Sequence, residues 1–97
     1  AKDKDIIAET RSAVMATQTL VDEEYAGKAV GSAVVVGAEN VTVDKIKKLA
    51  EIDGTIDETE VKITDGKVTE LVYEKDGKTC TYSVTGNKGT YEVKKSK

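Results

Sequence analysis

The first quarter of the chain carries apolar side chains at helical spacing. Within residues 3–25 they recur at intervals of three, four and seven positions, which places them on one face of an α-helix about 35 Å long. Gly27 follows, and glycine readily takes the left-handed conformation that ends many helices. The pattern therefore predicts an amphipathic helix. Its apolar positions are Ile6, Ile7, Ala13, Val14, Leu20, Val21 and Tyr25, and its polar face includes Lys4, Glu9, Arg11, Ser12, Gln18, Asp22 and Glu23.

A connecting region follows this helix. Residues 26–40 are rich in glycine and small side chains around the run 33–36, and we expect a loop with a short buried segment. Thr42 then has the side chain of a helix N-cap. It precedes a predicted short helix that ends at Gly54. The face of that helix would consist of Val43, Ile46, Leu49 and Ala50.

The last third alternates strand-like and turn-like segments. Strands are predicted at 60–64, 68–75, 79–85 and 90–94, separated by turns at 65–66, 76–77 and 86–89. This pattern indicates an antiparallel meander. A two-residue turn at 76–77 pairs Tyr73 with Cys80 and Leu71 with Tyr82, and a four-residue loop at 86–89 pairs Val84 with Tyr91 and Tyr82 with Val93.

In the first predicted hairpin, the turn sequence and the hydrophobic pattern favour different loop lengths. A two-residue Asp65-Gly66 turn would place Val61 opposite Glu70, with a charge beside the core. A three-residue loop that includes Lys67 would pair Val61 with Leu71 and Thr59 with Tyr73 instead. Burying such apolar side chains contributes about 1.5–3 kcal/mol each, so the longer loop is the prediction.

These elements predict an α+β fold in one domain. The N-terminal amphipathic helix (1–25) packs on a four-stranded meander (59–95), after a variable connection that contains the short helix (26–58). The row Val61, Leu71, Tyr82 and Val93 should cross the sheet. The predicted inner face consists of Val61, Ile63, Thr69, Leu71, Tyr73, Cys80, Tyr82, Val84, Tyr91 and Val93.

Composition narrows the function classes. The 97 residues include no histidine, which removes the commonest general base and zinc ligand, and the net charge of −3 does not favour nucleic acid. Cys80 is the single cysteine, and we expect it to be buried and inert. No apolar run is long enough to span a membrane. An enzyme is therefore not expected, and no catalytic, cofactor-binding or metal site is assigned.

Two alternatives concern ligands. The acidic stretch from Glu51 to Glu60 has enough oxygen ligands for calcium, but its spacing fits no EF-hand loop, and a solvated connection is the preferred interpretation. The four tyrosines could form a stacking platform for single-stranded nucleic acid. No basic groove accompanies them in the sequence, so core packing is preferred.

Three segments bear a resemblance to a known family. Residues 1–11 (AKDKDIIAETR), 48–56 (KLAEIDGTI) and 76–78 (DGK), with the helix–loop–meander order, resemble the head domain of type IV pilins and pseudopilins. Residues 1–11 look like the C-terminal half of the pilin spine helix. The absence of a C-terminal cysteine pair makes the likeness closer to the Gram-positive, clostridial type.

The resemblance implies a structural function. A pilin subunit assembles with other copies or other pilins into a surface filament, with the help of an assembly machinery. It would be anchored in the membrane, before assembly, by an apolar helix preceding Ala1, and would then lie outside the cell. The alternative is a small cystatin-like binding or inhibitor module, because that fold also combines a helix with an antiparallel sheet; its Gln-x-Val-x-Gly loop is not present.

Overall fold

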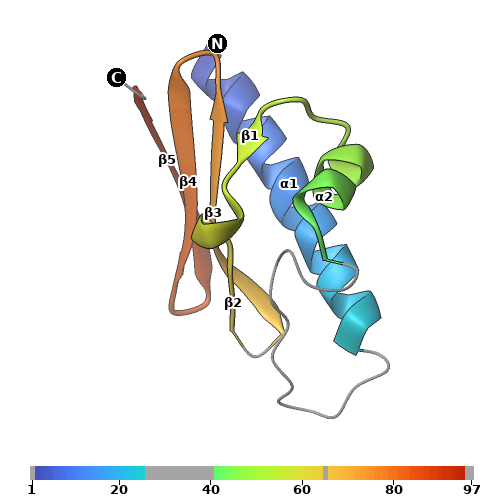
Figure 1. The fold of residues 1–97 in the computed structure, drawn as a ribbon. Helices are drawn as coiled ribbons and strands as arrows, with labels where there is room; N and C mark the ends of the chain where they lie inside the picture. Colours follow the sequence, from blue (N-terminus) through green and yellow to red (C-terminus); the bar gives the residue numbers. More distant parts are fainter. Residues whose placement is uncertain (1, 26–40, 65, 96–97) are drawn as a thin grey trace.

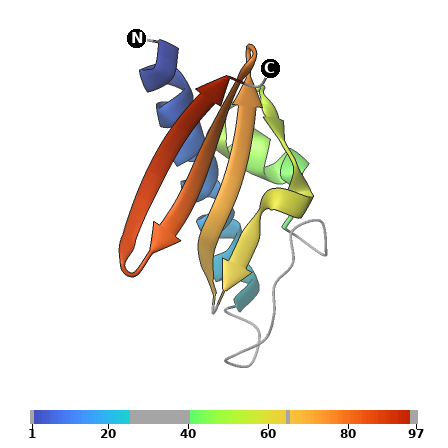
Figure 2. The same ribbon diagram turned by 90° about the vertical axis from the view of Figure 1, so that its left-hand side faces the viewer.

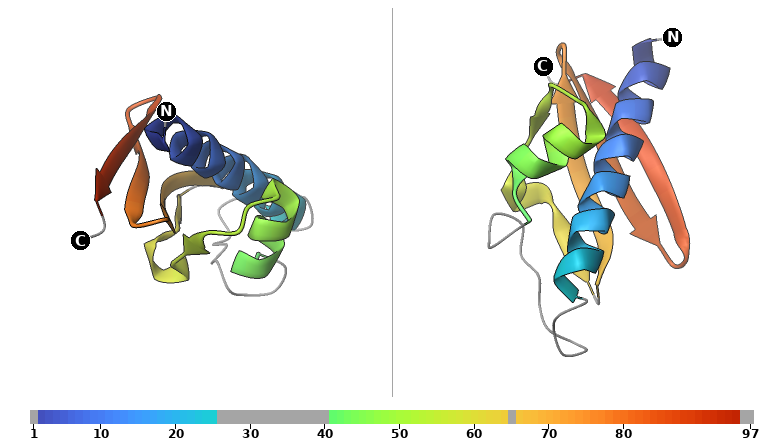
Figure 3. Two further views of the ribbon diagram at one scale, coloured as in Figure 1. Left: turned by 90° about the horizontal axis from the view of Figure 1, so that it is seen from above. Right: turned by 90° about the vertical axis from the view of Figure 1, so that its right-hand side faces the viewer.

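The computed structural model describes residues 2–25, 41–64 and 66–95, which form two layers (Figure 1). Helices α1 and α2 cover one face of an antiparallel sheet, and α2 lies beside α1 (Figure 3). The predicted α+β class and N-terminal helix are therefore confirmed. The elements are α1 (Lys2–Tyr25), α2 (Val43–Ala50), β1 (Thr55–Ile56), the 3-10 helix η1 (Glu58–Glu60), β2 (Lys62–Thr64), β3 (Lys67–Lys75), β4 (Lys78–Thr85) and β5 (Lys88–Lys95).

The sheet has five strands where four were predicted. Its order is β1-β3-β4-β5, and β2 also pairs with β3. Ile56 in β1 lies opposite Tyr73, where Thr59 was expected. The difference arises because Asp57 caps η1 by accepting a hydrogen bond from the Thr59 N–H at 2.9 Å, which turns residues 58–60 out of the strand. An apolar side chain thus replaces a threonine in the core.

Helix α1 buries small and polar side chains that the apolar stripe did not include. Ala16, Thr10 and Thr17 are 5%, 0% and 0% exposed. Each threonine hydroxyl donates to the carbonyl four residues earlier, Ile6 or Ala13, at 2.7 Å. Since their hydroxyls are satisfied within the helix, these threonines can face the core without an unpaired polar group.

Helix α2 begins as predicted and ends earlier. The Thr42 hydroxyl accepts from the Lys45 N–H at 3.2 Å, which confirms the N-cap. Glu51 takes the left-handed conformation at φ 57°, so Gly54 is not the terminator. Leu49 is 52% exposed, and its predicted place on the buried face is wrong. It lies about 100° around the helix from Ala50, which faces the core with Ile46.

The β2–β3 hairpin combines a short turn with a bulge. Thr64 pairs with Lys67, so the three-residue loop is wrong. Ile63 pairs with Val68 and Lys62 with Glu70, which leaves Thr69 as an extra residue in β3. The bulge turns Val68, which is 4% exposed, into the core in place of Thr69. It still leaves Leu71 buried, at 0% exposure. The chain thereby satisfies both the turn and the hydrophobic pattern.

The predicted strand pairing is right for the β3–β4 hairpin and wrong for the β4–β5 hairpin. Tyr73 pairs with Cys80 and Leu71 with Tyr82, as predicted. In the last hairpin the four-residue loop is wrong, because Thr85 pairs with Lys88. The predicted row is therefore also wrong in part. The rows observed are Leu71–Tyr82–Tyr91 and Ile56–Tyr73–Cys80–Val93.

Gly89 explains the shorter β4–β5 turn. It belongs to β5, opposite Val84, and a Cβ there would lie 2.7 Å from the ring atom Cε1 of Tyr82. The Tyr82 ring thus occupies the space above this glycine. Gly86 provides the left-handed turn position at φ 64°. The second glycine of the predicted loop is a packing position in a strand.

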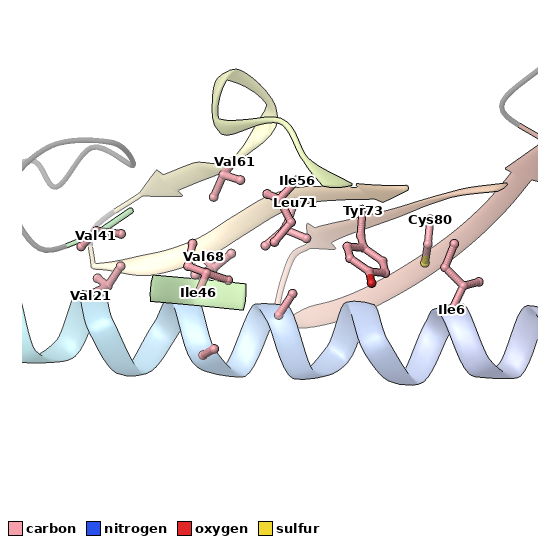
Figure 4. Packing of buried hydrophobic residues seen from close by; sticks show 12 residues of the cluster. Ile6, Val21, Val41, Ile46, Ile56, Val61, Val68, Leu71, Tyr73 and Cys80 are labelled. Carbon is pink, nitrogen blue, oxygen red and sulfur yellow. The ribbon is translucent and has the colours of Figure 1, made fainter. Parts of the chain in front are cut away.

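The core lies between α1 and the sheet, and α2 closes it on the side of β1 and β2 (Figure 4). The predicted segment at 33–36 and the helix stop at Gly27 lie outside the described residues. The buried apolar side chains are Ile6, Ala13, Ala16, Val21, Val41, Ile46, Ile56, Val61, Val68, Leu71, Tyr73 and Cys80.

Candidate functional site

Five residues from three parts of the chain form a polar cluster at the N-terminal half of α1. We call it the Tyr73 cluster; it consists of Glu9, Asp53, Gly54, Tyr73 and Lys75. The Tyr73 hydroxyl donates to Glu9 Oε1 at 2.6 Å and accepts from the Gly54 N–H at 2.9 Å. One buried oxygen therefore joins α1, β3 and the connection between α2 and β1.

Lys75 completes the cluster at the surface. Its Nζ lies 3.3 Å from both Glu9 carboxylate oxygens and 2.9 Å from Asp53 Oδ1. The hydrogen bond from Lys75 lowers the pKa of Asp53, and the hydrogen bonds to Asp53 and Glu9 raise the pKa of Lys75. Burial, together with the bond to Glu9, raises the pKa of Tyr73.

These pKa shifts decide what the cluster can do. Tyr73 stays protonated, and Lys75 and Asp53 stay ionised, across the neutral range. A general acid or base near neutral pH needs a pKa close to 7, and the shifts move these three groups away from it. The hydrogen bonds of the Tyr73 hydroxyl to Glu9 and Gly54 bind the helix to the sheet.

Gly54 belongs to the cluster for a steric reason. A Cβ at this position would lie 2.4 Å from Tyr73 Oη and 2.7 Å from the backbone oxygen of Glu74. A backbone oxygen cannot move aside as a flexible side chain can. Glycine is therefore needed for the close approach of the connection to β3.

A second polar contact binds the other half of α1. The Gln18 side chain donates from Nε2 to the Gly66 carbonyl at 2.8 Å and accepts at Oε1 from the Val68 N–H at 3.0 Å. Glu9 and Gln18 were both predicted only as parts of a solvated polar face. Their positions at the margin of the apolar stripe were the only signal that sequence offered.

The acidic stretch does not converge on one point. Asp53 is bound to Lys75, and Asp57 Oδ1 accepts from both the N–H and the hydroxyl of Thr59, at 2.9 and 2.6 Å. Among the residues that the structure describes, no group of three or more acidic or cysteine side chains is arranged to hold a metal ion. The calcium alternative gains no support from this geometry.

The tyrosines divide between core and rim. Tyr73 is fully buried, whereas Tyr82 and Tyr91 are half-buried with ring centroids 5.1 Å apart. The Arg11 guanidinium lies 5.5 Å from the Tyr91 ring centroid. All three rings lie on the face of the sheet toward α1, which agrees with core packing.

Cys80 is buried at 0% exposure beside Thr10, as the strand alternation predicted. Burial raises the pKa of its thiol, and only the thiolate is the reactive nucleophile. The cysteine is therefore a packing residue.

We expect the Cys80 thiol to react with an aromatic disulfide reagent about a thousandfold or more slowly in the native chain than in denaturant, because labelling requires opening of the fold. The reaction can be followed by absorbance. A Thr85→Cys variant provides an exposed control thiol on the same strand. Equal labelling rates for Cys80 and that control would contradict the burial of Cys80.

Within the described residues, neither helix combines the length and the apolar character needed to cross a membrane.

Comparisons with protein-family models, with curated proteins and with solved structures found no match to this chain.

Proposed function

We propose that this chain is the head of a type IV pilin-like subunit, a structural protein that acts by assembling into a filament at the cell surface. The observation that carries the proposal is the placement of α1. It is a 24-residue helix that lies along the sheet, and its first turn is at the margin of the fold (Figure 2). A helical continuation before Ala1 could leave the head without a bend.

The attachment of α1 supports this use. The helix is bound to the sheet by the core, by Tyr73 through Glu9, and by Gln18 near its other end. A subunit that transmits load from a helical spine to its head needs such a rigid connection. The resemblance of residues 1–11 to the second half of a pilin spine helix agrees with this arrangement.

The proposal defines the partners. They are other copies of the chain or related pilins, together with the assembly machinery, and contact with the membrane would come through the apolar helix expected before Ala1. The head would lie outside the cell. A Gram-positive host is expected from the same resemblance.

The native gene tests the proposal. We expect it to encode about 25 apolar residues before Ala1, since burial of that helix would contribute about 25 cal/mol for each Å² removed from water. In cells that carry a pilus assembly machinery, the full product should form surface filaments that are visible by electron microscopy. The fragment 1–97 should form none.

Two results would contradict this function. One is a native gene in which no apolar helix precedes Ala1. The other is ordered filaments formed by the fragment alone. A variant of the full product with a charged residue in the middle of the apolar helix is the matched control, because it leaves the head intact.

A further inference from the structure

The two edges of the sheet differ in backbone structure. β5 forms one edge, pairs with β4 over all eight of its residues, and lies on the side of the sheet away from α2 (Figure 2). The opposite edge consists of the short strands β1 and β2 with η1 between them. β5 is therefore continuous, while η1 interrupts the other edge.

The edges also differ in charge. β5 contains three lysines, Lys88, Lys94 and Lys95, against Glu92, a net charge of +2 in a chain of net charge −3. Residues 57–62 contain three carboxylates against Lys62, a net charge of −2. The charged side chains Lys88, Lys94, Lys95, Asp57, Glu58 and Glu60 are all exposed. One sheet thus has a basic edge and an acidic edge.

The lysines disfavour the simplest way of pairing two copies. Two β5 strands could in principle form an antiparallel ladder, but lysines on an edge strand are a common means of preventing such pairing. Like charges opposite each other in a ladder are destabilising. A partner with an acidic surface would not be repelled by these lysines. The chain itself carries such a surface, because a second copy presents its acidic edge.

We propose that the basic edge of one copy, β5, docks against the acidic edge of a second copy, residues 57–60. The contact is made by side chains, because η1 offers no continuous strand to extend the ladder. It is heterologous, so each copy keeps one edge free for the next copy. This inference rests on the proposed filament function and adds to it the surfaces by which neighbouring heads meet.

The contact between the charged edges would orient neighbouring heads relative to one another. Exposed ion pairs are individually weak and are screened by salt, with a Debye length of about 8 Å at physiological ionic strength. Complementary charge chiefly selects the partner surface and its register. The apolar helix would hold the filament together, and the charged edges would set how the heads lie side by side.

A charge-swap experiment tests the contact on the chain itself. The basic-edge variant is Lys88→Glu/Lys94→Glu, and the acidic-edge variant is Glu58→Lys/Glu60→Lys, which leaves the Asp57 cap in place. Association is measured by diffusion NMR at high protein concentration, first at low salt and then above about 0.5 M salt, where the Debye length falls to a few Å.

The expected results form a pattern. The native chain forms small oligomers at low salt, because exposed ion pairs alone are too weak to hold an ordered filament, and high salt disperses them. Each variant alone is monomeric, because its two edges then carry the same sign. An equimolar mixture of the two variants associates again, since each acidic edge can meet a basic one. The control Lys48→Glu/Lys67→Glu, which equals the basic-edge variant in net charge but lies outside both edges, retains the association of the native chain.

Several outcomes would overturn the contact. They are a native chain that stays monomeric at low salt, an acidic-edge variant that still associates alone through β5, and a mixture that fails to recover association. If filaments form in cells despite any of these, this contact is wrong and the filament function stands. If the mixture associates but the native gene product makes no filaments, the filament function is wrong and the charged contact stands.

Discussion

Replacing Tyr73 by alanine is expected to lower the free energy of unfolding by about 3–5 kcal/mol, a large part of the 5–15 kcal/mol typical of a domain. The ring is fully buried, and its hydroxyl joins Glu9 to Gly54. Urea unfolding followed by circular dichroism measures the change. Tyr73→Phe keeps the ring and leaves the Gly54 N–H without its acceptor, so we expect a smaller loss of about 1–3 kcal/mol.

The control for the hydroxyl is Tyr82→Phe, since Tyr82 is a half-buried ring in the neighbouring strand. We expect a change of about 0.5 kcal/mol or less. If Tyr73→Phe is as harmless as this control, the hydroxyl does not hold α1 on the sheet. Tyr73→Phe is expected to destabilise the fold less than Tyr73→Ala. The test therefore still gives a result if Tyr73→Ala does not fold.

The alkaline pH dependence gives a second readout for the same residue. Burial raises the pKa of Tyr73 above its ordinary value of 10.0, so above that pH the unfolded chain loses this proton while the folded chain retains it. The unfolded state then binds fewer protons, and the free energy of unfolding falls as pH rises. Tyr73→Phe should lack this part of the decline, whereas Tyr82→Phe should retain it.

Replacing Leu71 by alanine is expected to cost about 2–5 kcal/mol, because the side chain is 0% exposed between α1 and the sheet and would leave a cavity. Its neighbour Val72 lies on the other face of β3 and is only partly buried. Val72→Ala should therefore cost about 1 kcal/mol or less. Urea unfolding of both variants gives the comparison.

The Leu71 and Val72 pair tests the bulge at Thr69. Without the bulge, the turn at residues 65–66 would place Glu70 opposite Val61 and shift the side chains of β3 relative to β2. Equal costs for the two substitutions, or a larger cost at Val72, would show that β3 has a different register. Leu71→Val, a smaller truncation, keeps the comparison measurable if Leu71→Ala is unfolded.

The sequence by itself determined the long helix, the α+β class and part of the burial pattern. Helical spacing over residues 3–25 and strand alternation after residue 59 act locally, so the pattern was sufficient for the α+β class, the Thr42 cap and the burial of Cys80. The Asp76-Gly77 turn was also readable, because its left-handed φ values of 53° and 78° suit these two residue types.

Only the tertiary structure decided how the strands combine. Turn preference and burial competed at residues 65–66, and a bulge satisfied both, which a choice between loop lengths could not anticipate. In the same way Gly89 is a strand residue beneath the Tyr82 ring, although the glycine pattern predicted a loop position. Both outcomes depend on contacts between side chains on different strands.

The polar contacts of α1 were also beyond the sequence. Glu9 and Gln18 look like any solvated residue of a helix, and their partners Tyr73 and Val68 are 64 and 50 residues away along the chain. The predicted meander did place its first and last strands at opposite edges of the sheet, but η1, which carries the acidic edge, was not expected. Local pattern fixes what a segment becomes, whereas the partner of each polar group depends on how the finished elements pack.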